Sequence, residues 1–126
     1  MRIEHIAIWT NQMEEMREFY EKWFGAASGQ KYINSVKCFE SYFLNVGDGA
    51  RLELMTIPGL ADECESPRVG YAHISVSVGS REEVVIKTGH IRAAGYAVVS
   101  EPRVTGDGYF ESVVLDPDGN WIEITE

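Results

Sequence analysis

Residues 70–78, GYAHISVSV, alternate aliphatic and other side chains with the period of a β-strand. Successive side chains of a strand point to opposite faces, so one face of the sheet is expected to carry Ala72, Ile74, Val76 and Val78. His73 falls on the other face. A single histidine in mid-strand fits a surface residue, a hydrogen-bonded core residue or a ligand, and it is more often structural than a ligand. The role of His73 therefore depends on the rest of the chain.

The N-terminal stretch has the same form. Residues 2–9, RIEHIAIW, also alternate, and His5 stands 68 residues before His73 at the equivalent place. A helical pattern follows, with Asn11 and Glu14 as a candidate cap pair and Gly25 as the expected end. Its apolar face is built from residues at a spacing of three or four: Met16, Phe19, Tyr20, Trp23 and Phe24.

The second half repeats this order of elements. Ser80 and Glu83 form a capping box that opens a helix running to about Ala94, and Gly95 is expected to stop it. Strands are expected at 29–34, 39–46 and 50–57 in the first half and at 96–100, 109–115 and 120–125 in the second. Turn signals, Gly47-Asp48-Gly49 and Asp116-Pro117-Asp118-Gly119, precede the last strand of each half.

The pattern predicts a duplicated βαβββ unit with a period of about 70 residues. The triplet Phe39-Glu40-Ser41 recurs as Phe110-Glu111-Ser112, which supports the duplication. We expect an α+β fold in which tandem βαβββ modules form curved mixed sheets with the helices on the convex side. The chain, 1–126, is interpreted as a single domain with modules at about 1–57 and 70–126, joined by a polar, turn-rich linker at 58–69.

The composition excludes several classes of function. A net charge of −9 disfavours nucleic acids and anionic membrane surfaces as partners, because both require clustered basic residues. The sequence has neither an apolar run of membrane-spanning length nor a signal peptide, and its two cysteines stand in no metal or redox spacing. These features predict a cytoplasmic protein that acts on a small molecule.

Two glutamates extend the histidine pattern. Glu53, in RLELM, and Glu123, in NWIEITE, each stand between aliphatic residues, so they are expected on the face that carries His5 and His73. A lone glutamate on a strand is usually solvated, but these four residues occupy equivalent positions in the two halves. Two neutral imidazoles and two carboxylates balance one divalent cation and suit Zn, Ni, Co or Fe better than Ca or Mg. We therefore interpret His5, Glu53, His73 and Glu123 as a metal site.

The whole chain resembles the vicinal oxygen chelate superfamily, and most closely glyoxalase I (lactoylglutathione lyase) of the short bacterial type. The resemblance is carried by RIEHIAI, RLELM, YAHISVSV and DPDGNWIEI. It implies a lyase or isomerase that works through a metal-bound enediolate, with one divalent transition metal (Ni, Co or Zn) per site. It also implies that Glu53 and Glu123 are both ligands and candidate proton carriers, that a thiol such as glutathione is a co-substrate, and that the protein is a homodimer with sites at the interface.

The chain departs from the bacterial glyoxalase I pattern at two positions. That pattern has Arg four residues after the first histidine and Asn four residues after the first glutamate, both contacting glutathione, whereas this chain has Trp9 and Ile57. Trp9 and Met55 would make the substrate wall apolar, although Trp9 equally suits a core or a dimer interface. The alternatives are therefore an epimerase of the methylmalonyl-CoA type and a non-catalytic protein that binds hydrophobic ligands on the same fold.

Overall fold

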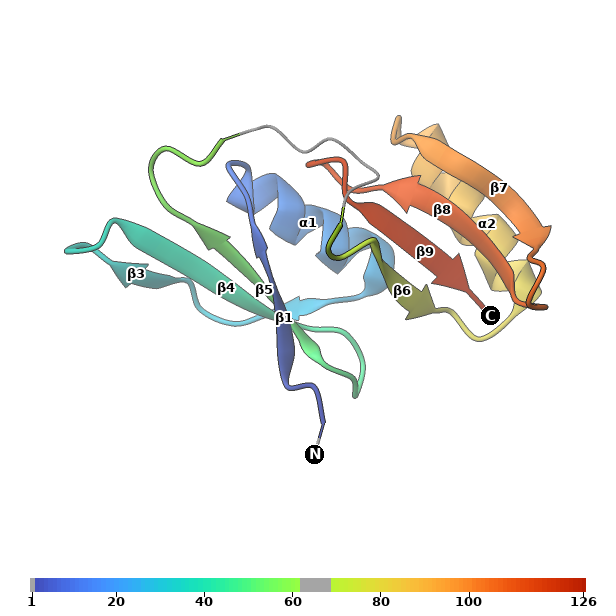
Figure 1. Cartoon of the computed structure of the whole chain (residues 1–126), viewed down its shortest axis with the longest axis horizontal. Helices are drawn as coiled ribbons and strands as arrows, with labels where there is room; N and C mark the ends of the chain where they lie inside the picture. The colour runs from blue at the N-terminus through green and yellow to red at the C-terminus, as the bar shows by residue number, and fades with distance from the viewer. Residues whose placement is uncertain (1, 62–68) are drawn as a thin grey trace. The chain divides into compact units, whose positions relative to one another are not determined.

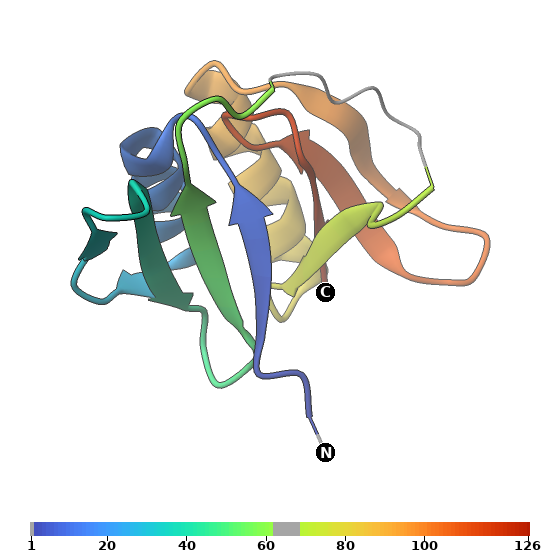
Figure 2. The ribbon, with the colours of Figure 1, turned by 60° about the vertical axis from the view of Figure 1, so that its left-hand side comes forward.

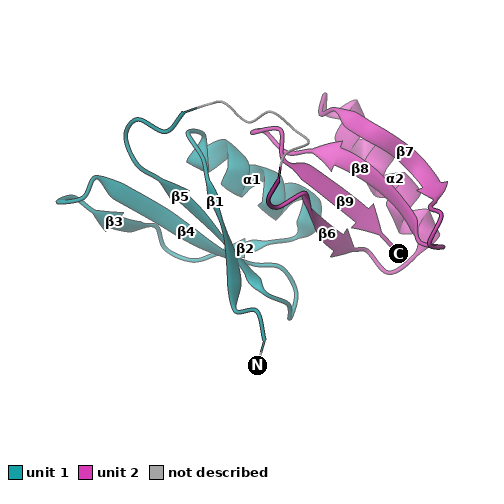
Figure 3. Ribbon diagram, viewed as in Figure 1, with its two compact units in different colours: residues 1–64 teal, residues 65–126 magenta. Residues whose placement is uncertain are grey.

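The computed structural model describes residues 2–61 and 69–126. The chain divides into two compact units, residues 1–64 and 65–126 (Figure 3). Most of the expected linker at 58–69 lies outside the described residues. Within the part of the chain that is described, no helix is both long and apolar enough to cross a membrane.

The first unit is a mixed sheet with one helix on it (Figures 1 and 2). Its elements are β1 (His5–Trp9), α1 (Met13–Phe24), β2 (Ala27–Ser28), β3 (Tyr32–Asn34), β4 (Phe39–Asn45) and β5 (Arg51–Thr56). The strand order is β1-β5-β4-β2, and β3 also pairs with β4. β1 runs parallel to β5, while the other pairs are antiparallel. Of the strand expected over 29–34, only β3 forms, and the short strand β2 precedes that range.

The second unit repeats this arrangement with fewer strands. Its elements are β6 (His73–Ser77), α2 (Arg81–Ala93), β7 (Val98–Val104), β8 (Phe110–Leu115) and β9 (Trp121–Thr125). The order is β6-β9-β8-β7, with β6 parallel to β9 and the remaining pairs antiparallel. In each unit the first strand therefore lies at the edge of the sheet with the last strand as its parallel neighbour. The expected α+β class with mixed sheets is confirmed.

Each helix packs on one face of its own sheet and forms a core there. In the first unit the fully buried side chains come from α1, β4 and β5: Met16, Phe19, Tyr20, Leu44 and Leu54. In the second they come from α2, β8 and β9: Val84, Thr88, Ile91, Ser112, Val114, Ile122 and Ile124. Thr88 and Ser112 satisfy each other inside this core through a hydrogen bond of 2.6 Å between their hydroxyls. The helix-covered face leaves the opposite face of each sheet for the histidines and glutamates.

The two helix starts differ. Ser80 caps α2 as expected, since its Oγ accepts a hydrogen bond of 3.2 Å from the Glu83 amide. The expected cap pair of Asn11 and Glu14 is wrong: the N-cap of α1 is Gln12, without a side-chain cap, and Asn11 donates instead to the carbonyl of Leu60. The carboxylate of Glu14 instead forms ion pairs with Arg17 and Lys31.

The register of the strands corrects the triplet match between the halves. Phe43 lies opposite Glu53, and Val113 lies opposite Glu123, so the equivalent strands are related by 70 residues. Aligning the two triplets would instead require an offset of 71 residues. The two hairpin turns do not provide the extra residue, because each spans five residues, 46–50 and 116–120. A slip of one residue reverses the face. Glu40 accordingly contacts Lys31 on the helix side, whereas Glu111 lies with Glu123 on the other.

The core of the first unit can be tested at Leu54, which is fully buried beneath α1. Leu54→Ala leaves a cavity and is expected to lower the free energy of unfolding by about 2–5 kcal/mol, measured by urea denaturation. Val36→Ala is the matched control, because Val36 is 96% exposed and its truncation should change stability little. An equal loss in both variants would contradict this assignment of the core.

Candidate metal centre

The first histidine and the first glutamate meet on the uncovered face of β1 and β5. In the parallel pairing of these strands, His5 lies opposite Arg51 and Ala7 lies opposite Glu53. His5 and Glu53 are therefore diagonal neighbours on one face, and His5 Nε2 lies 3.8 Å from Glu53 Oε2. The His5 side chain is 40% exposed and that of Glu53 is 13% exposed, so the imidazole is accessible from solvent while the glutamate is mostly shielded.

The second pair has the same register. His73 lies opposite Trp121 and Ser75 lies opposite Glu123. His73 Nε2 is 3.5 Å from Glu123 Oε2, with exposures of 42% and 18%. In both units the histidine opens the first strand, and the glutamate stands two residues beyond the histidine's partner on the last strand. The two pairs are thus structural repeats of each other, as the sequence offset predicted.

The other nitrogen of His5 is held by Glu4. The Nδ1 atom hydrogen-bonds the Glu4 carboxylate, which also accepts a bond of 2.8 Å from Arg51 Nε. The hydrogen bond from His5, and to a lesser extent that from Arg51, holds the pKa of Glu4 below its ordinary value. Because a carboxylate only accepts, Nδ1 carries the proton, and a neutral His5 presents the lone pair of Nε2 toward Glu53. A carboxylate behind the imidazole is the usual partner of a metal-binding histidine.

Glu123 has two neighbours that reasoning from the sequence missed. Ser75 Oγ donates a hydrogen bond of 2.6 Å to Glu123 Oε1. Glu111, on β8, is 8% exposed and lies diagonally across from Glu123 on the same face of the sheet. Burial raises the pKa of Glu111, and the charge of Glu123 raises it further, while Arg103 acts in the opposite direction from 3.5 Å away. The alternation of residues 70–78 puts Ser75 on the face of His73 and could have found it, whereas the triplet match equates Glu111 with Glu40, which lies on the helix side.

The donor atoms of each pair are suitably spaced for two ligands of one ion. Metal–ligand bonds of about 2.1 Å with tetrahedral angles separate neighbouring donors by about 3.4 Å, close to the 3.8 and 3.5 Å found here. Across residues 2–61 and 69–126, no group of three or more His, Cys, Asp or Glu is placed to hold a metal. Each pair therefore offers two donor atoms, and a metal site made of all four residues stays a prediction.

An aromatic cluster occupies the same face of the first unit. Trp9 lies opposite Met55, so both predicted substrate contacts share the face of His5 and Glu53. The Trp9 indole is 49% exposed and meets the Phe39 ring edge-on at 6.3 Å, and the Tyr32 ring lies 6.1 Å from Phe39. Trp9 is thus outside the core of this unit, which disfavours the core interpretation and leaves a contact with a ligand or with another protein surface.

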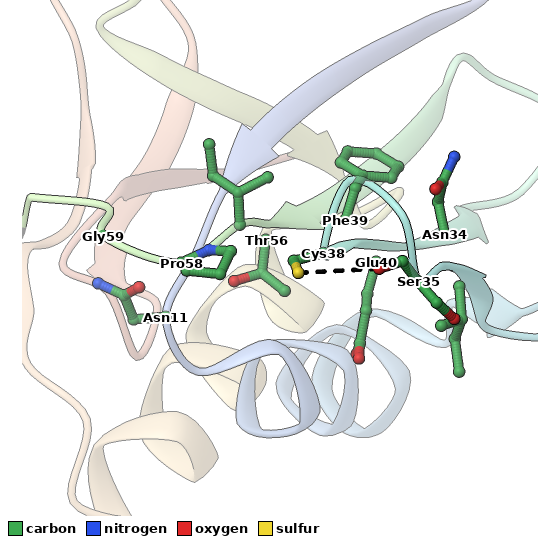
Figure 4. A pocket seen from close by; sticks show the side chains of 11 residues that line it. Asn11, Asn34, Ser35, Cys38, Phe39, Glu40, Thr56, Pro58 and Gly59 are labelled. Atoms are coloured by element: carbon green, nitrogen blue, oxygen red, sulfur yellow. Dashed lines mark hydrogen bonds between the residues drawn. The ribbon is translucent and has the colours of Figure 1, made fainter.

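A hollow of about 580 Å³ lies at one end of the first sheet (Figure 4). It is formed by the β3–β4 turn, the end of β5 and the residues that follow. Its lining residues are Asn11, Ile33, Asn34, Ser35, Cys38, Phe39, Glu40, Thr56, Ile57, Pro58 and Gly59. It includes none of His5, Glu53, His73, Glu123, Trp9 and Met55, although Ile57, at the second position where the sequence departs from the bacterial pattern, lines it. It shares only Phe39 with the aromatic cluster. The hollow is therefore distinct from the two His–Glu pairs.

Comparison with known proteins identifies the family. A model of the Glyoxalase/Bleomycin resistance protein/Dioxygenase superfamily matches residues 2–124. The chain belongs to this superfamily. No curated protein sequence matches the chain significantly. The expected resemblance to the vicinal oxygen chelate superfamily is therefore confirmed at the level of the family.

Solved structures of the superfamily share the fold. A glyoxalase family protein from Enterococcus faecalis is 23% identical with a TM-score of 0.80, over 99% of this chain and 97% of that one. The trypanothione-dependent glyoxalase I of Leishmania major is 22% identical with a TM-score of 0.80, over 100% and 86% of the two chains. Glyoxalase I from Zea mays is 19% identical with a TM-score of 0.80, and this chain spans 44% of its length.

The raised pKa of Glu111 makes a prediction about stability. An acid whose pKa is higher in the folded than in the unfolded state destabilises the fold once pH exceeds both values, and the penalty vanishes below the unfolded pKa. Glu111→Gln is therefore expected to be more stable than the unaltered protein at pH 8 and to lose this advantage below about pH 4. Urea denaturation of metal-free protein at both pH values measures the difference. Glu82→Gln, at an exposed helix position, is the control; an advantage for Glu111→Gln that is independent of pH would contradict the assignment.

Proposed function

We propose that the protein is a metal-dependent lyase or isomerase that works through an enediolate. The observation that supports this proposal is the repeated pair, in which a histidine and a glutamate lie at the same register on parallel strands of each unit. The duplicated fold explains why both units share a strand register, but it does not explain why a histidine and a glutamate occupy the same two positions in both. A metal site would explain it, because each pair offers one neutral nitrogen and one anionic oxygen on the uncovered face of its own sheet.

His5, Glu53, His73 and Glu123 would together hold one divalent transition metal, either Ni, Co or Zn. The set balances the charge of the cation and combines imidazole with carboxylate, which suits these metals. When bound, the metal would act as a Lewis acid that polarises two adjacent oxygens of the substrate and so acidifies the C–H bond between them.

The chain itself supplies the group that moves the proton. A glutamate carboxylate, Glu53 or Glu123, removes the proton from the carbon that carries the hydroxyl and returns it to the neighbouring carbon. Both carboxylates are mostly shielded from solvent, at 13% and 18% exposure, which limits exchange of the captured proton with water. Glu4 keeps His5 in the tautomer that leaves Nε2 unprotonated.

The best candidate reaction converts the hemithioacetal of a 2-oxoaldehyde and a thiol to a 2-hydroxyacyl thioester. Members of the superfamily named glyoxalase I share the fold of this chain, and one of them depends on trypanothione. Trp9 stands where the bacterial enzymes carry an arginine for glutathione, so the thiol is open to test. An epimerase of the methylmalonyl-CoA type would use the same proton transfer on a different acyl thioester.

A second candidate is the binding of a hydrophobic ligand without catalysis. The exposed rings of Trp9 and Tyr32 favour it, because aromatic rings left in water on a sheet face often receive an apolar partner. Binding of such a ligand by metal-free protein with unchanged affinity, together with absence of turnover, would favour this function over the enzyme.

Metal-dependent turnover is the first test. Apoprotein reconstituted with Ni, Co or Zn in turn is expected to bind one ion per site and to isomerise the methylglyoxal hemithioacetal of glutathione or trypanothione, followed by thioester absorbance. Glu123→Gln is expected to remain folded, to bind the metal at least about tenfold more weakly and to lose turnover. Failure with every metal and both thiols would reject the glyoxalase reaction, and full activity of Glu123→Gln would reject the mechanism.

The homodimer with shared sites makes a separate prediction. We propose that the His5–Glu53 pair of one copy joins the His73–Glu123 pair of another. A variant with His5→Gln and Glu53→Gln, and one with His73→Gln and Glu123→Gln, should each bind no metal. When the two variants are unfolded and refolded together, half of the sites in each mixed dimer are intact, so metal binding and turnover should return. No recovery on mixing, despite mixed dimers on native mass spectrometry, would show that each site lies within one chain.

A further inference from the structure

A row of polar side chains crosses the uncovered face of the second sheet, over the strands β6, β9, β8 and β7 (Figure 1). Thr125, two residues beyond Glu123 on β9, lies directly opposite Ser77 on one side and Glu111 on the other. Arg103, on β7, lies opposite Glu111. Residues directly opposite each other on paired strands share a face of the sheet. We call these four residues the polar row: Ser77, Thr125, Glu111 and Arg103.

The first sheet has an equivalent row of different chemistry. Met55, two residues beyond Glu53 on β5, lies opposite Trp9 on one side and Ser41 on the other. Tyr32, on β3, lies opposite Ser41. In both rows the two outer residues are exposed, and the residue on β4 or β8 is buried. The same positions thus present two aromatic rings and a thioether in the first unit, but hydroxyls and charges in the second.

The polar row does not satisfy all of its own hydrogen-bonding groups. Thr88 and Ser112, on the helix-covered face of the same sheet, bond each other, as buried polar groups of a structural core do. Thr125 Oγ1, by contrast, is buried and has no hydrogen-bond partner among residues 2–61 and 69–126. Ser77 and Arg103 are exposed, so a ligand can reach both ends of the row. The row therefore differs from a closed structural network and is open to a ligand.

The charges of the polar row balance each other. Arg103 Nη2 lies 3.5 Å from Glu111 Oε1, so the guanidinium already has an anionic partner and the row offers little net charge to an anion. Hydroxyl, carboxylate and guanidinium groups together supply both hydrogen-bond donors and acceptors. This combination suits an uncharged group that carries hydroxyls, because each hydroxyl both donates and accepts.

Resting on the proposed function, we propose that the polar row is a specificity subsite that receives an uncharged, hydroxyl-bearing part of the substrate. Thr125 is one step of the strand alternation from Glu123, about 7 Å, so a substrate held at Glu123 reaches the row within a few bonds. In a hemithioacetal this part belongs to the thiol, since the aldehyde partner in the assay carries only a methyl group. The equivalent row of the first unit offers an apolar wall instead.

Three thiols with the same three-carbon chain test the subsite: 1-thioglycerol, 1-propanethiol and 3-mercaptopropionate. The kcat/KM of each methylglyoxal hemithioacetal is measured at pH 8 with protein loaded with a metal that supports turnover. The kcat/KM for 1-thioglycerol is expected to exceed that for 3-mercaptopropionate by about tenfold, because the balanced charges of the row leave a carboxylate without a cationic partner. A preference for 3-mercaptopropionate would overturn the proposal.

Variants at the exposed ends of the row locate the effect. Ser77→Ala and Arg103→Leu are each expected to lower kcat/KM for 1-thioglycerol by about tenfold and to leave that for 1-propanethiol unchanged. Arg92→Leu is the matched control, since Arg92 is 49% exposed and pairs with Glu101, as Arg103 is 48% exposed and pairs with Glu111. Metal affinity of every variant checks that the His–Glu pairs are intact. Equal losses for both thiols, or no loss for 1-thioglycerol, would overturn the proposal.

Glu111→Gln completes the test by a gain of activity. It leaves the charge of Arg103 without its partner, so kcat/KM for 3-mercaptopropionate is expected to rise about tenfold relative to that for 1-thioglycerol. An unchanged ratio would show that the substrate does not reach the row. If none of the three thiols is turned over with any metal, the proposed function fails and this inference fails with it. Turnover of all three that is independent of Ser77, Arg103 and Glu111 removes this inference alone.

Discussion

The parallel pairing of the first and last strands of each unit is the constraint on which the rest depends. β1 beside β5 and β6 beside β9 bring residues some 50 positions apart to the same face, with the histidine and glutamate offset diagonally. A parallel pair needs a long crossover, and α1 and α2 provide it while burying the opposite face of each sheet. The crossover helix and the histidine–glutamate face are thus two consequences of one connection.

The burial of one face explains why the site can be open. Leu54 and Ile122, next to the glutamates in sequence, are fully buried under the helices, so the alternation of the strand directs Glu53 and Glu123 outward. Shifting either strand by one residue would expose leucine or isoleucine and bury a carboxylate without a partner, at a cost of several kcal/mol. The hydrophobic core therefore enforces the register that the donor atoms need.

A duplicated fold also allows its halves to diverge in their neighbours. The ligand positions repeat, but Glu4 supports the histidine in the first unit, and Ser75 and Glu111 support the glutamate in the second. The first unit adds the exposed rings of Trp9 and Tyr32 on its ligand face. The histidine and glutamate of each pair thus repeat between the units, while the residues that surround them do not.

The sequence by itself determined the duplication, the helix and strand order, the face of each ligand and, through the family, the class of fold, because alternation and capping are local signals. It misjudged the start of α1, where ion pairs competed with a cap, and it paired Glu40 with Glu111, which lie on opposite faces. Only the tertiary structure decided the register, and with it the contacts of Ser75 and Glu111 with Glu123. The physical reason is that strand pairing joins distant segments, and a shift of one residue, invisible in a short sequence match, reverses every side chain.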